Sequence, residues 1–284
     1  MTSAAAEEIV WIESEDGLRL DGAVHRPTGG EAKPIAVVQV HGHTGRFSHP
    51  VHIRLGRGLA HHGYVSVTGN NRGWAFGETT LRRGERVVIG GGWERFHETP
   101  LDIGPWVDFA LGLGVRAVAL LGHSFGGPKV VYYQAQRQDP RVVALICASP
   151  GPMTDVMTPT AEALALAKQM VAEGRGQHLL PWGSHRGSTL SAQAVLDRAP
   201  ANRATYDVFG LYTPSPAVGR VACPILAFYG SRENLGMPEL ERIRRAATAA
   251  PRVDIRIFEG ADHAYTGQEQ EVASGVAAWL DSVI

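Results

Sequence analysis

The sequence predicts an α/β fold with a mostly parallel central sheet and helices on both faces. Short, almost continuously apolar segments alternate with segments of helical periodicity, which is typical of strands buried on both sides. The expected strands are 35–40, 64–68, 117–121, 142–148, 225–229 and 253–258, and the expected helices are 51–62, 100–113, 127–138, 238–249 and 269–283. Ligands of such folds bind beyond the carboxyl ends of the strands, so functional residues are expected in the loops there.

An antiparallel hairpin is expected at the N-terminus, ahead of the parallel strands. Two runs of alternating polarity, 8–13 and 18–25, flank the pair Asp16 and Gly17. An Asp-Gly pair between alternating runs favours a tight turn.

Residues 152–217 interrupt the alternation of strand and helix. They contain two weakly amphipathic helical stretches, 161–173 and 191–209, and are longer than a single crossover between neighbouring strands needs. We therefore expect a core of residues 1–151 and 218–284, with residues 152–217 inserted as a helical lid. The alternative is a pair of ordinary crossover helices.

The composition is that of a globular protein that acts on small molecules. Hydrophobic residues make up 44% and charged residues 19% of the 284 residues, and the formal net charge is -1. Because this charge attracts neither nucleic acid nor an anionic membrane, neither is an expected partner. The N-terminus lacks a secretory signal and no apolar stretch is long enough to span a bilayer, which favours a cytoplasmic location. Homodimer formation is left open.

Residues 122–126, Gly-His-Ser-Phe-Gly, fit the pattern G-x-S-x-G where a buried strand should turn sharply into a helix. A serine in that turn is forced into a strained backbone conformation that lifts its hydroxyl out of the sheet, and Gly122 and Gly126 leave the space that it needs. Ser124 is therefore the candidate nucleophile. The N–H of Phe125 starts the helix without an intrahelical acceptor, so it is half of a candidate oxyanion hole. The alternative, a plain Gly/Ser loop, leaves the flanking strand and helix unexplained.

The ordered set of motifs resembles the α/β-hydrolase family over essentially the whole chain. The resemblance rests on the His-Gly loop at 41–45, the serine turn at 122–127, Gly-Ser-Arg-Glu at 230–233 and Gly-Ala-Asp-His at 260–263. It implies a nucleophile, an acid and a base in that order along the chain, and no cofactor. Residues 93–150 are also loosely similar to uncharacterised hydrolases related to siderophore-ester hydrolases, which names no substrate.

By this resemblance His263 is the general base, because it follows the last predicted strand where the family places its base. A serine hydroxyl is too weakly acidic to attack an ester unaided and needs a neutral imidazole to accept its proton. His123 is the rival, but its side chain should leave the strand on the opposite side from Ser124. It is expected to pack or to cap.

By the same resemblance Glu233 is the acid that holds the imidazole of His263 in the correct tautomer. Many relatives have aspartate at this position, so the loop must accommodate one extra methylene. Asp155 and Asp262 remain alternatives. Glu233 would in that case be a solvated partner of a nearby arginine.

The resemblance also makes the N–H of His43 the second oxyanion donor, because a strand that ends in His-Gly brings the backbone close to the serine. Trp74, Trp93 and Trp182 are candidates for the apolar wall of a substrate pocket. Arg72 is expected to be a buried brace rather than a substrate ligand.

No metal is expected. Histidines 41, 43, 49, 52, 61 and 62 were the candidate ligands, but no Asp-His pair follows at the spacing that a dinuclear hydrolase requires. Cys147 and Cys223 lie in or just before predicted strands, which favours buried thiols over a disulfide or a metal site.

The expected function is hydrolysis of a carboxylic ester of a small molecule through an acyl-enzyme. A serine nucleophile also serves thioester, lactone, amide and carbon–carbon bond hydrolysis. A ligand-binding member of the same fold, without turnover, is the alternative from another functional class.

Overall fold

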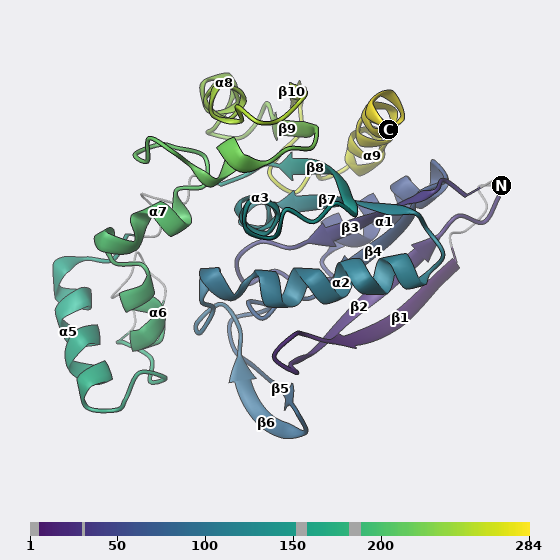
Figure 1. Ribbon diagram of the computed structural model, residues 1–284. Helices are drawn as coiled ribbons and strands as arrows, with labels where there is room; N and C mark the ends of the chain where they lie inside the picture. Colours follow the sequence, from purple (N-terminus) through teal and green to yellow (C-terminus); the bar gives the residue numbers. More distant parts are fainter. Residues whose placement is uncertain (1–5, 30–31, 152–157, 182–188) are drawn as a thin grey trace.

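A mostly parallel β-sheet forms the centre of the molecule (Figure 1). The computed structural model describes residues 6–29, 32–151, 158–181 and 189–284, and within them the sheet has eight strands in the order β1-β2-β4-β3-β7-β8-β9-β10. They are β1 (Ala6–Glu13), β2 (Arg19–Arg26), β3 (Ile35–Val40), β4 (Val65–Gly69), β7 (Ala117–His123), β8 (Val142–Ala148), β9 (Ile225–Gly230) and β10 (Val253–Phe258). β2 pairs antiparallel with β1 and β4, and the other pairs are parallel. The predicted fold class is confirmed.

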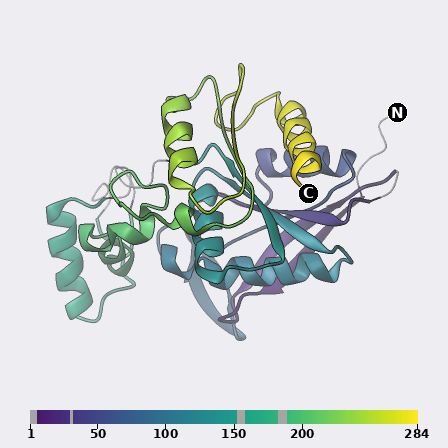
Figure 2. The ribbon, with the colours of Figure 1, turned by 45° about the horizontal axis from the view of Figure 1, so that its top comes forward.

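Helices cover both faces of the sheet, α1 and α9 on one face and α2, α3 and α8 on the other (Figures 1 and 2). Their bounds are α1 (Pro50–His61), α2 (Pro100–Gly112), α3 (Gly126–Arg137), α8 (Met237–Ala246) and α9 (Glu269–Val283). All of them begin and end within three residues of the predicted bounds, because each has an apolar face that only burial against the sheet satisfies. No helix in the described part of the chain combines the length and the apolar character needed to cross a membrane.

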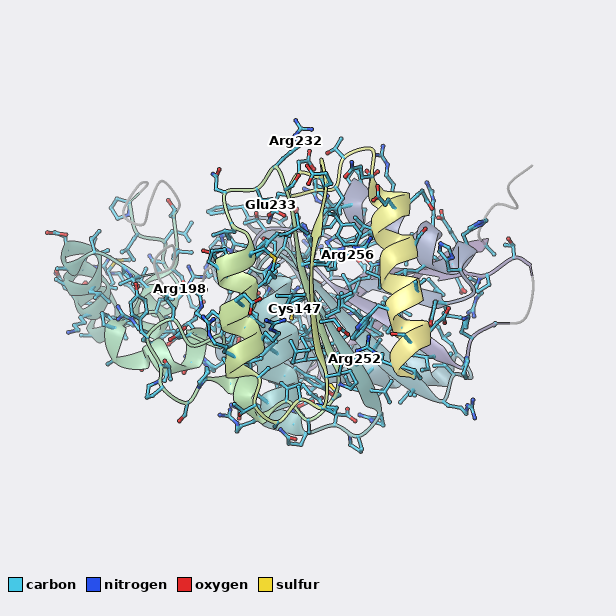
Figure 3. All side chains as sticks on the ribbon, turned by 90° about the horizontal axis from the view of Figure 1, so that it is seen from above. Cys147, Arg198, Arg232, Glu233, Arg252 and Arg256 are labelled. Atoms are coloured by element: carbon cyan, nitrogen blue, oxygen red, sulfur yellow. The ribbon has the colours of Figure 1, made fainter. Side chains whose placement is uncertain are left out.

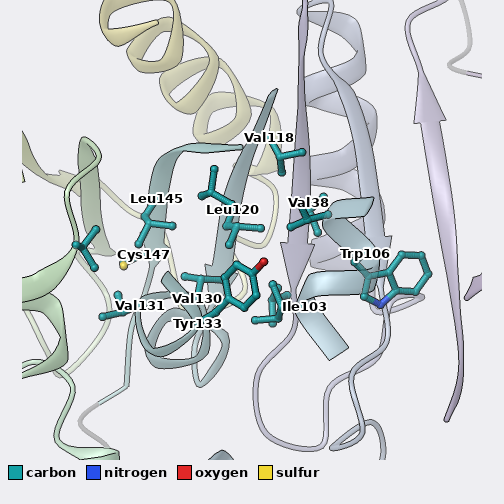
Figure 4. Close-up of a cluster of buried hydrophobic side chains, with 14 of the residues drawn as sticks. Val38, Ile103, Trp106, Val118, Leu120, Val130, Val131, Tyr133, Leu145 and Cys147 are labelled. Carbon is teal, nitrogen blue, oxygen red and sulfur yellow. The ribbon is translucent and has the colours of Figure 1, made fainter. Parts of the chain in front are cut away.

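The core is divided by the sheet into two layers. Alternate residues of a strand point to opposite faces, so Leu120 packs under α2 and α3 (Figure 4) while Leu121 packs under α1 and α9. Cys147 lies in the first layer, and both it and Cys223 are buried free thiols, as predicted. This double burial holds the carboxyl ends of the strands in fixed positions, and the candidate site lies on their loops.

A small two-stranded hairpin, β5 (Glu78–Arg82) and β6 (Glu85–Ile89), projects from the sheet and was not predicted. Arg83 and Gly84 connect its strands, both with positive φ (50° and 85°), as a two-residue hairpin turn requires. Its strands are largely exposed. The apolar alternation that marks a half-buried strand is therefore weak in this segment.

A helical segment extends away from the sheet, and part of it packs around a separate apolar cluster (Figure 2). Its main helices are α5 (Ala161–Ala172), α6 (Ala192–Asp197) and α7 (Arg203–Tyr206). The single helical stretch expected at 191–209 is wrong, because the helix ends before Pro200. Proline lacks an N–H and disfavours a helical residue before it, and Ala199 is accordingly extended at ψ 149°. The division into core and lid at residues 152 and 217 stays a prediction.

Candidate active site

Ser124 lies in the sharp turn between β7 and α3, with a strained backbone. Its φ is 56°, a left-handed conformation that side chains rarely adopt, and its N–H donates to the carbonyl of Ala148 at 2.9 Å. A Cβ on Gly122 would lie 2.1 Å from the carbonyl oxygen of Gly126, and one on Gly126 would lie 2.0 Å from that of Val40. Only glycine fits at either position, so the sequence pattern follows from the turn.

The loop after β3 lies against this turn. A Cβ on Gly42 would come within 2.9 Å of Ser124 Cβ and 3.2 Å of the backbone nitrogen of Phe125. Phe125 precedes the first residue of α3, so its N–H has no intrahelical acceptor. His41 holds the loop in place, since its Nδ1–H donates to the carbonyl of Gly42 at 2.8 Å and its Nε2 accepts the N–H of Asn71 at 3.0 Å.

Glu233 and His263 are joined by a hydrogen bond between loops that follow β9 and β10. His263 Nδ1 donates to Glu233 Oε2 at 2.6 Å. The imidazole is 51% exposed and the carboxylate 7%, so the acid is shielded while the base remains accessible. In Figure 3, Arg232 lies at the upper edge of the view, and Glu233 lies closer to the centre of the molecule. This bond is what an acid that fixes the tautomer of a general base requires.

Ser149, which the sequence analysis did not single out, holds Glu233 and is itself bonded to Tyr265. Ser149 Oγ donates to Glu233 Oε1 at 2.6 Å, and the hydroxyls of Ser149 and Tyr265 lie 2.7 Å apart. Oε1 also accepts the N–H of Gly230 at 2.8 Å. Burial alone would raise the pKa of Glu233, but the hydrogen bonds from His263, Ser149 and Gly230 outweigh it and hold the pKa below its ordinary value. A signal for Ser149 was present, because it follows a buried strand at the predicted functional edge.

His123 connects the serine turn to the loop of His263. Its Nε2–H donates to the carbonyl oxygen of His263 at 2.7 Å, and the two rings lie 5.0 Å apart. The residue next to Ser124 thus directly contacts the residue with the candidate base. His123 is 7% exposed and packs, with its ring nitrogen occupied by this contact.

The two alternative acids differ in what the structure says of them. Asp262 Oδ1 accepts the N–H groups of Ala264 and Thr266 at 3.0 and 2.9 Å, so it caps the turn that follows. Asp155 lies outside the described residues. So does Trp182, one of the three tryptophans considered for the pocket wall.

Trp93 joins the core to the helical segment. Its indole N–H donates to the carbonyl of Gln177 at 2.9 Å, and its ring lies 6.1 Å from that of Phe76. Trp74 is half-buried against the core. These contacts are made with other parts of the protein and do not test whether the two tryptophans line a substrate pocket, which stays a prediction.

Arg72 lies buried at the centre of a group of acids. Its guanidinium donates to Asp102 at 2.8 Å, Glu98 at 2.7 Å and Asp16 at 3.0 Å. These contacts tie the loop after β4 to α2. The N–H groups of the guanidinium are therefore engaged by the protein and are not available to bind a substrate.

Among the described residues, no group of three or more His, Cys, Asp or Glu side chains is arranged to hold a metal ion. Both ring nitrogens of His41 are occupied by the protein. His52 Nδ1 lies 3.3 Å from Gln39 Oε1.

A buried ion pair, which the sequence reading also missed, lies behind the loop of His43. Lys129 is fully buried in α3, forms an ion pair with Glu94, and donates to Asn71 Oδ1 at 3.0 Å. Glu94 Oε2 faces His43 Nδ1 at 3.9 Å, and a Cβ on Gly91 would lie 2.9 Å from the ring of His43. Burial would raise the pKa of Glu94, but Lys129 and His43 hold it well below its ordinary value.

Replacement of Lys129 by methionine is expected to destabilise the fold by about 3–5 kcal/mol, because it leaves the carboxylate of Glu94 buried and uncompensated. The double variant Lys129→Met with Glu94→Gln removes both charges and should recover most of that loss. Urea denaturation of both proteins measures the difference. Equal stability of the single and double variants would contradict a compensating pair.

Three buried histidines are expected to make folding sensitive to acid. Burial lowers the pKa of His41 to about 3 and that of His123 to about 4, from an ordinary value of 6.5, and keeps that of His52 well below 6.5. Since the unfolded chain binds these protons first, stability is complete above pH 6.5 and falls as the pH drops toward 4. At pH 5.5 the loss is roughly 1 kcal/mol per histidine.

Thermal denaturation at pH 7.5 and pH 5.5 measures this loss, and the Tm should fall by several degrees. His61, which is exposed at the end of α1, provides the control. His61→Gln should show the same fall as the unaltered protein. A Tm that does not change between the two pH values would show that the three rings are not held neutral.

The sheet order and the strained serine after β7 place the protein in the α/β-hydrolase class. Residues 37–274 match the Alpha/beta hydrolase family, and the chain belongs to that family. The fold is similar to Est1E from Butyrivibrio proteoclasticus, with a TM-score of 0.64 at 18% identity, covering 99% of this chain and 98% of that one.

Two further solved structures share the fold. An esterase from Pyrococcus furiosus has a TM-score of 0.61 at 15% identity, with 98% of this chain and 92% of that one covered. A soluble variant of monoglyceride lipase from Saccharomyces cerevisiae has a TM-score of 0.66 at 15% identity, with 99% and 96% covered. The sequence matches none of the curated proteins. At these identities the likeness concerns the fold alone.

Proposed function

We propose that the protein is a serine hydrolase that cleaves a carboxylic ester of a small molecule through an acyl-enzyme intermediate. The observation that carries this proposal is the 2.6 Å hydrogen bond from His263 Nδ1 to Glu233, in a loop that directly contacts the turn of the strained Ser124. That bond fixes a proton on Nδ1 and leaves Nε2 as an acceptor. A base in this tautomer, beside a serine raised out of its sheet, is what acyl transfer requires.

In the proposed reaction His263 Nε2 takes the proton of Ser124 as its oxygen attacks the ester carbonyl. The N–H groups of His43 and Phe125 stabilise the negative charge on the carbonyl oxygen. His263, now an imidazolium stabilised by Glu233, gives its proton to the departing alcohol. Water then attacks the acyl-enzyme by the same steps in reverse, and no cofactor takes part.

The helical segment is proposed to act as a lid that selects the substrate. Trp93 supports this, because it is hydrogen-bonded to that segment and lies two residues after Gly91, which packs on the ring of His43. Trp74 is proposed as a further part of the pocket wall. Esters are the leading candidate substrates, ahead of thioesters, lactones, amides and carbon–carbon bonds, because ester hydrolysis is the commonest and least demanding reaction of a serine nucleophile with a histidine base.

A panel of 4-nitrophenyl esters, thioesters and lactones, with and without a serine-directed sulfonyl fluoride and a chelator, tests the proposal. The expected result is turnover of at least one ester, lost with the sulfonyl fluoride and kept with the chelator. Turnover that the chelator abolishes would indicate a metal enzyme. Ligand binding without turnover of any compound would favour the non-catalytic alternative.

A further inference from the structure

Arg198 is a buried arginine that has no carboxylate partner among the described residues. It follows α6 in the helical segment, on the side toward α8 and the sheet (Figure 3), and is 5% exposed. Among the described residues no carboxylate forms an ion pair with its guanidinium, and no oxygen accepts a hydrogen bond from it. Buried charges in proteins are normally paired, because removing a charge from water is costly. Arg198 departs from this rule.

The acids around Arg198 are already paired with other cations. Asp197, the preceding residue, binds Arg95. Glu94, whose charge also acts on Arg198, is paired with Lys129. Arg198 therefore differs from Arg95 and Lys129, because the described residues offer its positive charge no carboxylate partner. Burial accordingly lowers the pKa of Arg198 below its ordinary value.

The guanidinium nitrogens of Arg198 keep some contact with solvent. In the described part of the chain, the fully buried side-chain atoms without a hydrogen-bond partner include Glu94 Oε2 and His43 Nδ1, but none of the nitrogens of Arg198. Because these nitrogens also donate no hydrogen bond, each of them keeps some accessible surface. Part of the 5% exposure of Arg198 therefore belongs to its charged end.

An ion pair and a group of aromatic rings connect the segment of Arg198 to the proposed oxyanion hole. Asp197, which precedes Arg198, forms an ion pair with Arg95, which precedes Phe96. The ring of Tyr206 lies 5.3 Å from that of Phe96. Phe96 in turn stacks on Phe125 at 5.4 Å, and Phe125 carries one of the proposed oxyanion donors. On the other side, Glu94 lies next to His43, which carries the second donor. Arg198 thus belongs to the same region as the proposed reaction.

We propose that Arg198 binds a carboxylate group of the substrate, so that the protein prefers esters that carry a free carboxylate. This inference rests on the proposed function and names a substrate class for it. A guanidinium binds a carboxylate through two parallel hydrogen bonds, a geometry that lysine does not offer. One guanidinium matches one carboxylate group.

Paired substrates test this preference. Mono-4-nitrophenyl esters of succinic, glutaric and adipic acid carry a carboxylate on the acyl side, and nitrophenyl esters of the matching unbranched monoacids are their neutral controls. Acetoxybenzoates and acetoxybenzamides form the same comparison on the alcohol side. In at least one pair kcat/KM should be tenfold or more higher for the charged ester. Arg198→Gln should remove that difference, mainly through KM, with the neutral ester changed less than about threefold.

Two further variants separate recognition from structure. Arg175 lies in the same helical segment, is 42% exposed and pairs with Glu173, so Arg175→Gln removes the same charge from the surface and should keep the preference. Arg198→Lys keeps the positive charge but cannot form the two parallel hydrogen bonds, so it should keep only part of the preference for charged esters. An equal loss on charged and neutral esters in Arg198→Gln would reduce Arg198 to a structural role and overturn the proposal.

Calorimetry with succinate, glutarate and adipate tests Arg198 independently of turnover. The unaltered protein should bind at least one of these dicarboxylates, and Arg198→Gln should not. If no ester is hydrolysed but a dicarboxylate binds through Arg198, the proposed reaction fails and the anion site stands. Absence of binding to all three, or binding that Arg198→Gln leaves unchanged, overturns the anion site, as does an unaltered enzyme that hydrolyses charged and neutral esters equally.

Discussion

Replacement of Ser124 by alanine is expected to lower kcat/KM for ester hydrolysis by about 10,000-fold or more, because it removes the atom that forms the acyl-enzyme. The backbone of the turn should remain intact. Alanine has the same Cβ as serine at a φ of 56°, and the glycines packed around the turn are unchanged. The Tm should therefore stay within a few degrees while activity is lost.

Initial rates with a 4-nitrophenyl ester, together with thermal denaturation, separate these two effects. Ser274 of α9 provides the matched control, because it is half-buried and its hydroxyl contacts the carbonyl of Gln270 and His62, far along the chain from Ser124. Ser274→Ala should keep its full rate. A Ser124→Ala protein that folds and still turns over at more than about one hundredth of the normal rate would move the nucleophile elsewhere.

Replacement of Glu233 by glutamine is expected to lower kcat by roughly 1,000- to 10,000-fold, with little change in KM. The reason lies in the donors around the carboxylate. Oε1 accepts hydrogen bonds from Ser149 and Gly230, so the carbonyl oxygen of a glutamine must take that position and its NH2 group must face His263. The NH2 group then donates to Nδ1 and forces the ring proton onto Nε2, where it blocks acceptance of the serine proton.

Steady-state kinetics of Glu233→Gln and Asp262→Asn provide the test. Asparagine keeps the oxygen that caps Ala264 and Thr266, so Asp262→Asn should retain a near-normal rate. The opposite result, with Asp262→Asn impaired and Glu233→Gln normal, would make Asp262 the acid. A normal rate in both would direct attention to Asp155.

Most of the sheet and its helices could be predicted from the sequence because each is specified locally. A strand such as β3, apolar along its whole length, must be buried on both sides, and the glycines beside Ser124 are required by one sharp turn. The hairpin β5–β6 and the break at Pro200 were missed. The hairpin buries little surface, so its sequence shows no clear alternation of apolar and polar residues. The break at Pro200 lies within a helical periodicity of apolar residues that continues on both sides of it.

The parts of the site that were missed depend on contacts between distant segments. Lys129 lies in a helix that periodicity predicts correctly, but only the fold brings Glu94 to it. Ser149 likewise contacts Glu233 and Tyr265, which come from two other loops. Arg198 is unusual because the part of the chain that the structure describes offers it no carboxylate partner, a property that no local pattern of residues expresses.

The central claim is that Ser124 forms a covalent bond to the substrate with His263 as its base. Labelling with a fluorophosphonate, followed by peptide mass spectrometry, measures this directly. One adduct is expected, on Ser124, and it should form far more slowly in His263→Ala. An adduct on another residue, or ester hydrolysis that continues while Ser124 stays unlabelled, would contradict the claim.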